Sequence, residues 1–185
     1  DISSSGLSFN SKDYRDNSSI VITEFGGIPL TKSGSQFINF TGSITATDSP
    51  LITVADNMFR DCSSNPDITH FDMSTATTVN GMFYNAISFN QDIGNWNMGN
   101  VTDMGNLFYN ASSFNQDISG WNTSNVTDMN NMFNEASSFN QYVGDWNTSN
   151  VTDMNSMFAN SSFNQYIGDW DTTNVTNMKS LFTVR

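Results

Sequence analysis

Aromatic residues recur along most of this chain at an interval of 24 or 25 positions, separated by stretches rich in Asn, Ser and Thr. Two sets keep this interval and form the candidate core: Trp96, Trp121, Trp146 and Trp170, and Phe89, Phe114, Phe139 and Phe163. A unit of this length cannot bury an apolar face by itself, whereas a stack of such units can. The interval therefore predicts stacked repeats whose aromatic residues lie above one another in a shared core.

Within one unit the spacing of the apolar residues changes along the chain. Met129, Met132, Phe133 and Ala136 follow the i, i+3, i+4, i+7 pattern that is typical of the apolar stripe of a short helix. Residues 114–118 are bounded by Ser and Gly and favour a strand. We expect one short parallel strand and one short helix per repeat, with neighbouring strands about 4.8 Å apart.

The unit that starts at Phe114 reads FNQDISGWNTSNVTDMNNMFNEASSF. This string resembles the repeat of the BspA-like leucine-rich surface proteins, and the resemblance covers about residues 51–185. It implies a leucine-rich-repeat-type solenoid that is secreted or lies on a cell surface, and that is often adhesive and without known catalysis. We expect a right-handed solenoid in residues 51–185, with about four full repeats and a partial C-terminal one.

Residues 1–50 lie outside the repeat pattern. Segments 19–25 and 36–47 alternate or are β-branched enough to form strands, and glycines between them indicate turns. We expect a small N-terminal β-rich cap that hides the open edge of the first repeat. The alternative is a docking segment that adds a strand to another molecule.

The chain stops inside a unit, because no strand follows the segment that ends at Phe182. We expect an uncapped end with an apolar face around Ile167, Trp170 and Leu181. Covering this face with another copy predicts head-to-tail association, and a fibre if the rotation does not close. The candidate docking residues at the other end of the chain are Ile2, Leu7 and Phe9.

The charge distribution excludes two classes of partner. The formal net charge is -12, and no Lys or Arg stands between Arg60 and Lys179. Nucleic acids and anionic membranes are bound through basic side chains, and no apolar run approaches the roughly 20 residues of a membrane span. We expect no nucleic-acid partner and no membrane insertion. The start at Asp1 suits a secreted chain whose signal peptide has been removed.

Groups that carry out catalysis are scarce in this sequence. His70 is the single histidine and Cys62 the single cysteine, so no intrachain disulfide and no histidine cluster can form. No phosphate-binding glycine motif and no nucleophile elbow occurs. We expect a protein that is not an enzyme and that uses no cofactor.

Three aspartates occupy one position in successive repeats: Asp103, Asp128 and Asp153, followed by Asn177. Like charges about 5 Å apart repel one another, so each carboxylate needs compensation. Capping by backbone N–H groups is one explanation. Calcium held between carboxylate and amide oxygens is the weaker alternative, because the spacing matches no calcium loop.

Polar residues next to the Phe114 position also repeat. Asn90, Asn115, Asn140 and Asn164 predict an amide ladder that satisfies backbone groups. The glutamines that follow are expected to face outward, beside two tyrosines whose rings suit a sugar or a peptide. The candidate binding surface consists of Gln116, Gln141, Tyr142, Gln165 and Tyr166.

N-glycosylation sequons are dense in this sequence. The candidates are Asn17, Asn39, Asn100, Asn110, Asn122, Asn125, Asn147, Asn150, Asn160 and Asn174. Glycans would supply solubility to a surface with few charges. The repeat itself generates Asn-Val-Thr four times, however, so these residues equally suit turns in an unglycosylated protein.

Two functions fit these expectations. One is an extracellular structural protein that assembles head to tail into a fibre or a coat, which the uncapped end favours. The other is a surface adhesin that recognises a host protein or a glycan through its ladder surface, which the family resemblance and the tyrosines favour.

Overall fold

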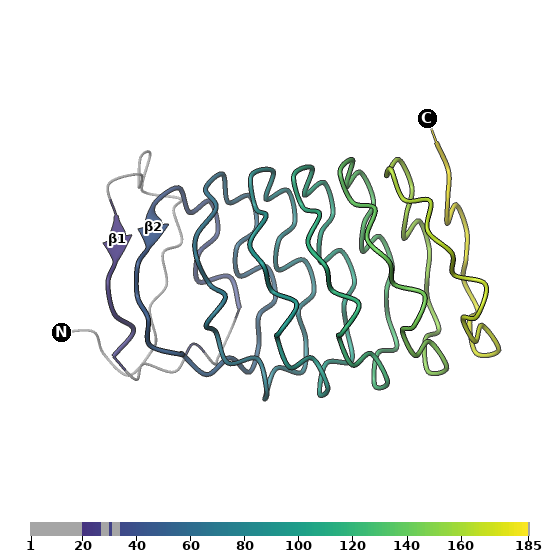
Figure 1. Cartoon of the computed structure of the whole chain (residues 1–185), viewed down its shortest axis with the longest axis horizontal. Coiled ribbons are helices and arrows are strands. Elements are labelled where there is room, and N and C mark those ends of the chain that lie inside the picture. Colours follow the sequence, from purple (N-terminus) through teal and green to yellow (C-terminus); the bar gives the residue numbers. More distant parts are fainter. Residues whose placement is uncertain (1–19, 27–29, 31–33, 185) are drawn as a thin grey trace.

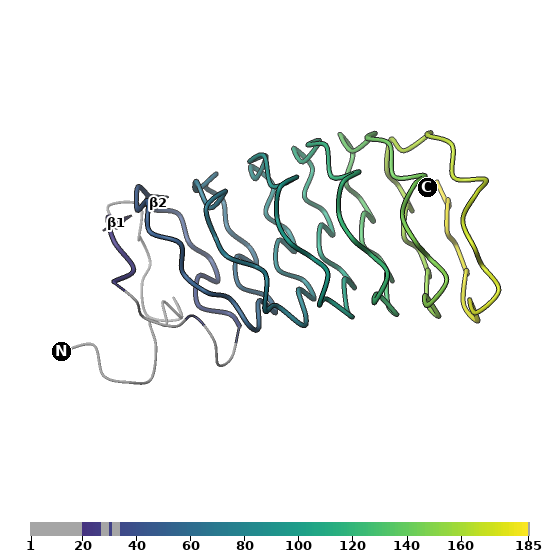
Figure 2. The same cartoon turned by 60° about the horizontal axis from the view of Figure 1, so that its bottom comes forward.

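The structure, a computed structural model, describes residues 20–26, 30 and 34–184. Figure 1 shows the chain wound into similar coils that lie side by side along the longest axis of the molecule. Figure 2 shows the same succession of coils from a second direction, with β1 and β2 at one end of the stack and the last coils at the other. Residues one repeat apart in the sequence are therefore neighbours in space.

Regular secondary structure is sparse. Strands β1 (Val21–Ile22) and β2 (Ser43–Ile44) pair in parallel, and the described residues contain no helix and no third strand. Single parallel bridges join the later coils, and one continuous series runs through Thr78, Asp103, Asp128, Asp153 and Asn177. The repeat interval of 24 or 25 residues is thus also the register between coils.

The short helix expected at residues 129–136 is not formed, and this prediction was wrong. Asn131, Phe133 and Glu135 each donate their backbone N–H to a carbonyl of the next coil at 2.8 Å. The acceptors are Asn155, Met157 and Ala159. In a helix the same N–H groups would bond four residues back along the chain.

The backbone of this segment turns sharply at every fourth residue. Asn131 and Glu135 have positive φ angles of 52° and 63°, in the left-handed region. The N–H groups that do not reach the next coil bond three residues back, as Asn134 does to Asn131. This zigzag buries every third or fourth side chain, so it produces the apolar spacing of a helix without being one.

The strand expected at residues 114–118 is also absent. Here the side chain of asparagine, rather than a backbone carbonyl, spans the distance between coils. The N–H of Asn115 donates to Oδ1 of Asn90, and the N–H of Asn140 donates to Oδ1 of Asn115, both at 3.0 Å. The structure contains the amide ladder, but this ladder takes the place of the strand pairing that was expected beside it.

The core is a set of stacked aromatic rings. The Phe133 ring lies 5.6 Å from the rings of Phe108 and Phe158, measured between centroids, and 3.9 Å from that of Phe139. Trp121 and Trp146 are 6.3 Å apart and nearly parallel. All eight residues of the candidate core are buried. Stacked rings at this spacing bury large apolar areas and add favourable ring contacts.

Three tryptophans also tie one coil to the preceding one. Nε1 of Trp121 donates to the carbonyl of Ile93, and Nε1 of Trp146 donates to that of Ile118. Trp170 makes the equivalent bond to Val143, whereas the buried Nε1 of Trp96 has no partner. Each bond satisfies a carbonyl of the preceding coil that Phe at this position would leave without this donor.

The stack begins before residue 51. The Phe37 ring stacks on that of Phe59 at 4.9 Å, and the N–H of Ser35 donates to the carbonyl of Asp56. The part of the expected cap between residues 34 and 46 is therefore packed as a coil of the same stack. The candidate docking residues Ile2, Leu7 and Phe9 lie outside the described residues.

Candidate functional site

The aspartate series lies along one side of the stack and is satisfied by amide donors. Oδ1 of Asp103 accepts the N–H of Gly105 at 2.8 Å, and Asp128 and Asp153 accept the N–H two residues further on in the same way. Nδ2 of Asn80 bonds both oxygens of Asp103 at 3.1 Å. Backbone capping thus occurs at a turn rather than at a helix, because no helix follows.

Several carboxylate oxygens of this series already accept hydrogen bonds. The donors just described occupy carboxylate oxygens that a cation would need as ligands, and Nδ2 of Asn177 occupies Oδ2 of Asp153. Within residues 20–26, 30 and 34–184, no group of three or more His, Cys, Asp or Glu side chains is arranged to hold a metal ion. These contacts give the ladder a structural role.

The fold disfavours the ionised form of Asp103. Burial raises the pKa of its carboxyl group, and the carboxylates of Asp128 and Asp56 act in the same direction. The hydrogen bonds from Gly105 and Asn80 oppose this shift without cancelling it. A raised pKa means that the ionised form is less favourable in the folded chain than in the unfolded chain.

We expect Asp103→Asn to raise the free energy of unfolding at pH 7 by about 0.5–1 kcal/mol, since the group is only partly buried and its repulsion is screened. Asn177 shows that asparagine fits this position. The pKa of Asp103 is about 3.9 in the unfolded chain and higher in the folded chain. The parent chain therefore loses stability as the pH rises from the lower of these two pKa values through the higher one. The gain should therefore disappear at pH 3, where the carboxyl group is neutral in both states.

Urea unfolding of both proteins at pH 7 and pH 3 measures this difference. Asp117→Asn is the matched control, because that carboxylate is exposed and the hydrogen bonds from Ser119 lower its pKa. This control should lose a little stability at pH 7. An equal effect of Asp103→Asn at both pH values would contradict the interpretation.

The glutamine and tyrosine surface lies beside the amide ladder. Gln116 and Gln141 donate Nε2 to the backbone carbonyls of Asn90 and Asn115, and Nε2 of Gln165 bonds Oδ1 of Asn140. The glutamine donors therefore point into the ladder rather than toward solvent. The tyrosine rings remain open to solvent, with 39% of Tyr142 and 63% of Tyr166 exposed.

Residues that the sequence interpretation missed complete this surface. The hydroxyl of Tyr142 donates to Oδ1 of Asp145 at 2.9 Å, and this hydrogen bond raises the pKa of the tyrosine. Tyr166 makes the same contact with Asp169 at 3.3 Å. The signal was available, since each tyrosine is followed by Gly at the second position and Asp at the third.

The sequons fall into classes with different geometry. Asn100, Asn125, Asn150 and Asn174 donate Nδ2 to a carbonyl of the preceding coil at 2.7 Å. Asn110, Asn39 and Asn160 adopt positive φ angles, and Asn17 lies outside the described residues. Asn122 and Asn147 instead use Oδ1 to accept the N–H two residues on, and the described residues contain no acceptor bonded to their Nδ2 groups. The sequence alone does not separate these classes.

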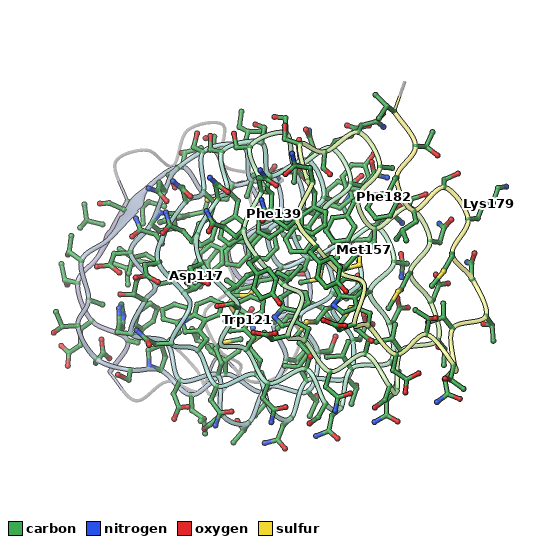
Figure 3. The ribbon with its side chains drawn as sticks, turned by 45° about the vertical axis from the view of Figure 1, so that its right-hand side comes forward. Asp117, Trp121, Phe139, Met157, Lys179 and Phe182 are labelled. Atoms are coloured by element: carbon green, nitrogen blue, oxygen red, sulfur yellow. The ribbon has the colours of Figure 1, made fainter. Side chains whose placement is uncertain are left out.

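The last coil carries exposed apolar side chains, but not the set that was expected. Ile167 and Leu181 are partly buried, whereas Trp170 is only 9% exposed because its ring lies 6.2 Å from that of Phe158. The exposed apolar residues at this end are Met178, Phe182 and Val184, and 51% of Phe182 is exposed. Figure 3 shows Phe182 on the coils nearest the C-terminus, with Lys179 at the outer edge.

The two residues considered for catalysis are placed among apolar neighbours. Cys62 is buried, and burial raises the pKa of its thiol, so the reactive thiolate is disfavoured. The ring of His70 lies 6.4 Å from that of Phe25 and 5.4 Å from that of Phe71. Sγ of Cys62 lies 3.3 Å from the hydroxyl of Ser64, and His70 interacts electrostatically with the carboxylate of Asp67.

Comparison with known proteins identifies the family. The family model described as "Mycoplasma protein of unknown function, DUF285" matches the chain twice, over residues 31–116 and 113–184. The chain belongs to this family. Two successive DUF285 matches agree with the tandem repetition of the sequence. No curated protein and no solved structure matches the chain. In the part that the structure describes, no helix is long and apolar enough to cross a membrane.

Proposed function

We propose that this member of the DUF285 family is a non-enzymatic, extracellular repeat scaffold, a right-handed solenoid of the leucine-rich-repeat type related to the BspA-like surface proteins. The recurring FNQDI, WNTSNVTDM and MF segments support the relationship. The stacked aromatic rings and the coil-to-coil hydrogen bonds support the solenoid. The buried Cys62 thiol and the packing of His70 support a function without catalysis.

The scaffold associates head to tail into a fibre or a surface coat, and the last coil carries this proposal. The Phe182 ring stacks on that of Phe158 at 5.7 Å, and its other side is open. The N–H groups of Ser156 and Phe158 each donate to the coil that follows. The equivalent N–H groups of Ser180 and Phe182 have no such acceptor among the described residues. A second copy would cover this face by supplying carbonyl acceptors and an apolar edge.

Sedimentation velocity over a range of protein concentrations tests this association. The parent chain should form species of increasing length, and Phe182→Asp should remain monomeric because a charge replaces the stacking ring. Tyr166→Asp, on the lateral surface, is the control and should associate like the parent. A parent chain that stays monomeric at the highest concentration would overturn the proposal.

A second candidate function is recognition of another molecule by the lateral surface, as in an adhesin. The exposed rings of Tyr142 and Tyr166 favour it, because exposed aromatic rings mark sites of binding more often than plain polar surface does. If the chain is made where N-glycans are attached, Asn122 and Asn147 fit a glycan best, since their Nδ2 groups are free. Both asparagines are exposed.

A further inference from the structure

One position changes its chemistry along the stack. It is occupied by Asp92 and Asp117 in two coils and by Tyr142 and Tyr166 in the next two. The aspartates close a local turn, since Asp92 accepts the N–H of Gly94 and Asp117 that of Ser119. A tyrosine cannot accept this bond in the same way, so the two tyrosines give up a stabilising turn contact.

Each tyrosine ring instead lies over a glycine of its own coil. A Cβ added to Gly144 would be 2.7 Å from Cζ of Tyr142, and one added to Gly168 would be 2.6 Å from Cζ of Tyr166. One side of each ring thus rests on the main chain, and the hydroxyl is held by Asp145 or Asp169. The exposed part of the two rings is therefore presented in a fixed orientation.

The side-chain donors of this surface are already engaged, whereas its carboxylates carry uncompensated charge. The tyrosine hydroxyls donate to the aspartates, and Gln141 and Gln165 donate into the amide ladder. No Lys or Arg occurs between Arg60 and Lys179, and the described residues contain no ion pair to Asp145 or Asp169. The two tyrosine rings and the carboxylates of Asp145 and Asp169 remain exposed to solvent.

We propose that the surface formed by Tyr142, Tyr166, Asp145 and Asp169 binds a basic peptide segment. Arg and Lys side chains carry only donors, and they bind both aromatic faces and carboxylates. Sugar hydroxyls pair with donors as well as acceptors, and anionic ligands are repelled, so both classes fit less well. This inference rests on the second candidate function, recognition by the lateral surface.

The spacing of the coils agrees with such a segment. Equivalent rings of neighbouring coils are 5.6 Å apart in the core, as Phe133 and Phe158 are. In an extended peptide, side chains on one face are about 6.8 Å apart. Two basic residues separated by one residue are therefore spaced similarly to equivalent positions of neighbouring coils, which are 6.3 Å apart at Trp121 and Trp146.

Fluorescence anisotropy with a labelled hexapeptide of alternating Arg and Ser tests the proposal. The parent chain should bind it in a salt-dependent way. The double variant Tyr142→Asp/Tyr166→Asp should bind about five- to thirtyfold more weakly, because it loses two cation–π contacts. The variant restores the residue found at positions 92 and 117, followed by the same Gly as at position 94, so the coil accommodates it.

This substitution separates ring recognition from simple attraction of charge, because it adds two negative charges to the surface. Equal or tighter binding of the peptide by the double variant would overturn the proposal. Gly144→Ser should also weaken binding, since the new Cβ displaces the Tyr142 ring. Asp92→Asn/Asp117→Asn, on the same side of the stack, is the control and should change binding less than threefold.

Other outcomes distinguish the basic-peptide proposal from lateral recognition in general and from head-to-tail association. Binding of neutral maltohexaose in place of the peptide would overturn the choice of ligand and leave lateral recognition standing. If neither probe binds, the basic-peptide proposal fails, while sedimentation of the same protein still decides head-to-tail association.

Discussion

Replacing Phe133 with alanine is expected to lower the free energy of unfolding by about 3–5 kcal/mol, the range seen for large aromatic truncations in a core. The ring is fully buried and stacks on Phe108 and Phe158 in the two neighbouring coils. It also lies 3.9 Å from Phe139 within its own coil. In a stack whose units contact only their neighbours, this one change weakens two interfaces at once.

Phe182→Ala is the matched control for that substitution. It removes the same atoms from the same position of the repeat, but the ring is half exposed and stacks on Phe158 alone. Its effect should be below about 1 kcal/mol, in line with partial burial. Guanidinium unfolding of the three proteins measures both values. Similar losses for the two variants would contradict a continuous ring ladder as the main source of stability.

The ring ladder could be predicted from the sequence because it depends only on recurrence. Stacking requires the same residue type at the same interval, and Phe108, Phe133 and Phe158 satisfy this requirement with no knowledge of the local backbone. The amide ladder of Asn90 and Asn115 follows by the same reasoning. A side chain that accepts a hydrogen bond from the next coil can do so again at the same position of every repeat.

The local backbone could not be predicted in the same way. The apolar spacing of Met129, Met132 and Phe133 is shared by a helix and by the zigzag that the chain adopts. The difference lies in which acceptor each N–H group finds, and that acceptor belongs to another coil. Asn131 was a usable signal, because asparagine tolerates positive φ, but Glu135 adopts the same conformation without such a preference.

The candidate binding surface was predicted in part. The tyrosines stand out in the sequence because they replace aspartates of earlier repeats. The roles of Gly144 and Asp145 require the ring orientation, since a glycine two residues away is otherwise an ordinary turn residue. The glutamines were expected to face outward, and the structure adds that Nε2 of Gln141 donates to the carbonyl of Asn115.

Gly34→Ala is the second substitution for which we expect a large loss, about 2–5 kcal/mol, from strain and crowding together. Gly34 has a φ angle of 61°, and an added Cβ would lie 2.9 Å from backbone N and C of Asp56 in the next coil. Backbone atoms cannot rotate away as a side chain can, so the two coils must separate. The neighbouring bond from Ser35 N–H to the carbonyl of Asp56 would weaken with that movement.

Gly26→Ala separates the two causes of this loss. Gly26 has nearly the same φ angle, 62°, but an added Cβ would meet no atom within 4 Å. Its substitution should therefore cost only the conformational strain of alanine at positive φ, about 1–2 kcal/mol. Thermal and guanidinium unfolding of both variants give the difference, which is the cost of forcing coils apart. If the two substitutions proved equally harmful, the close approach at Asp56 would carry no energetic weight, and strain at the left-handed glycines alone would account for both losses.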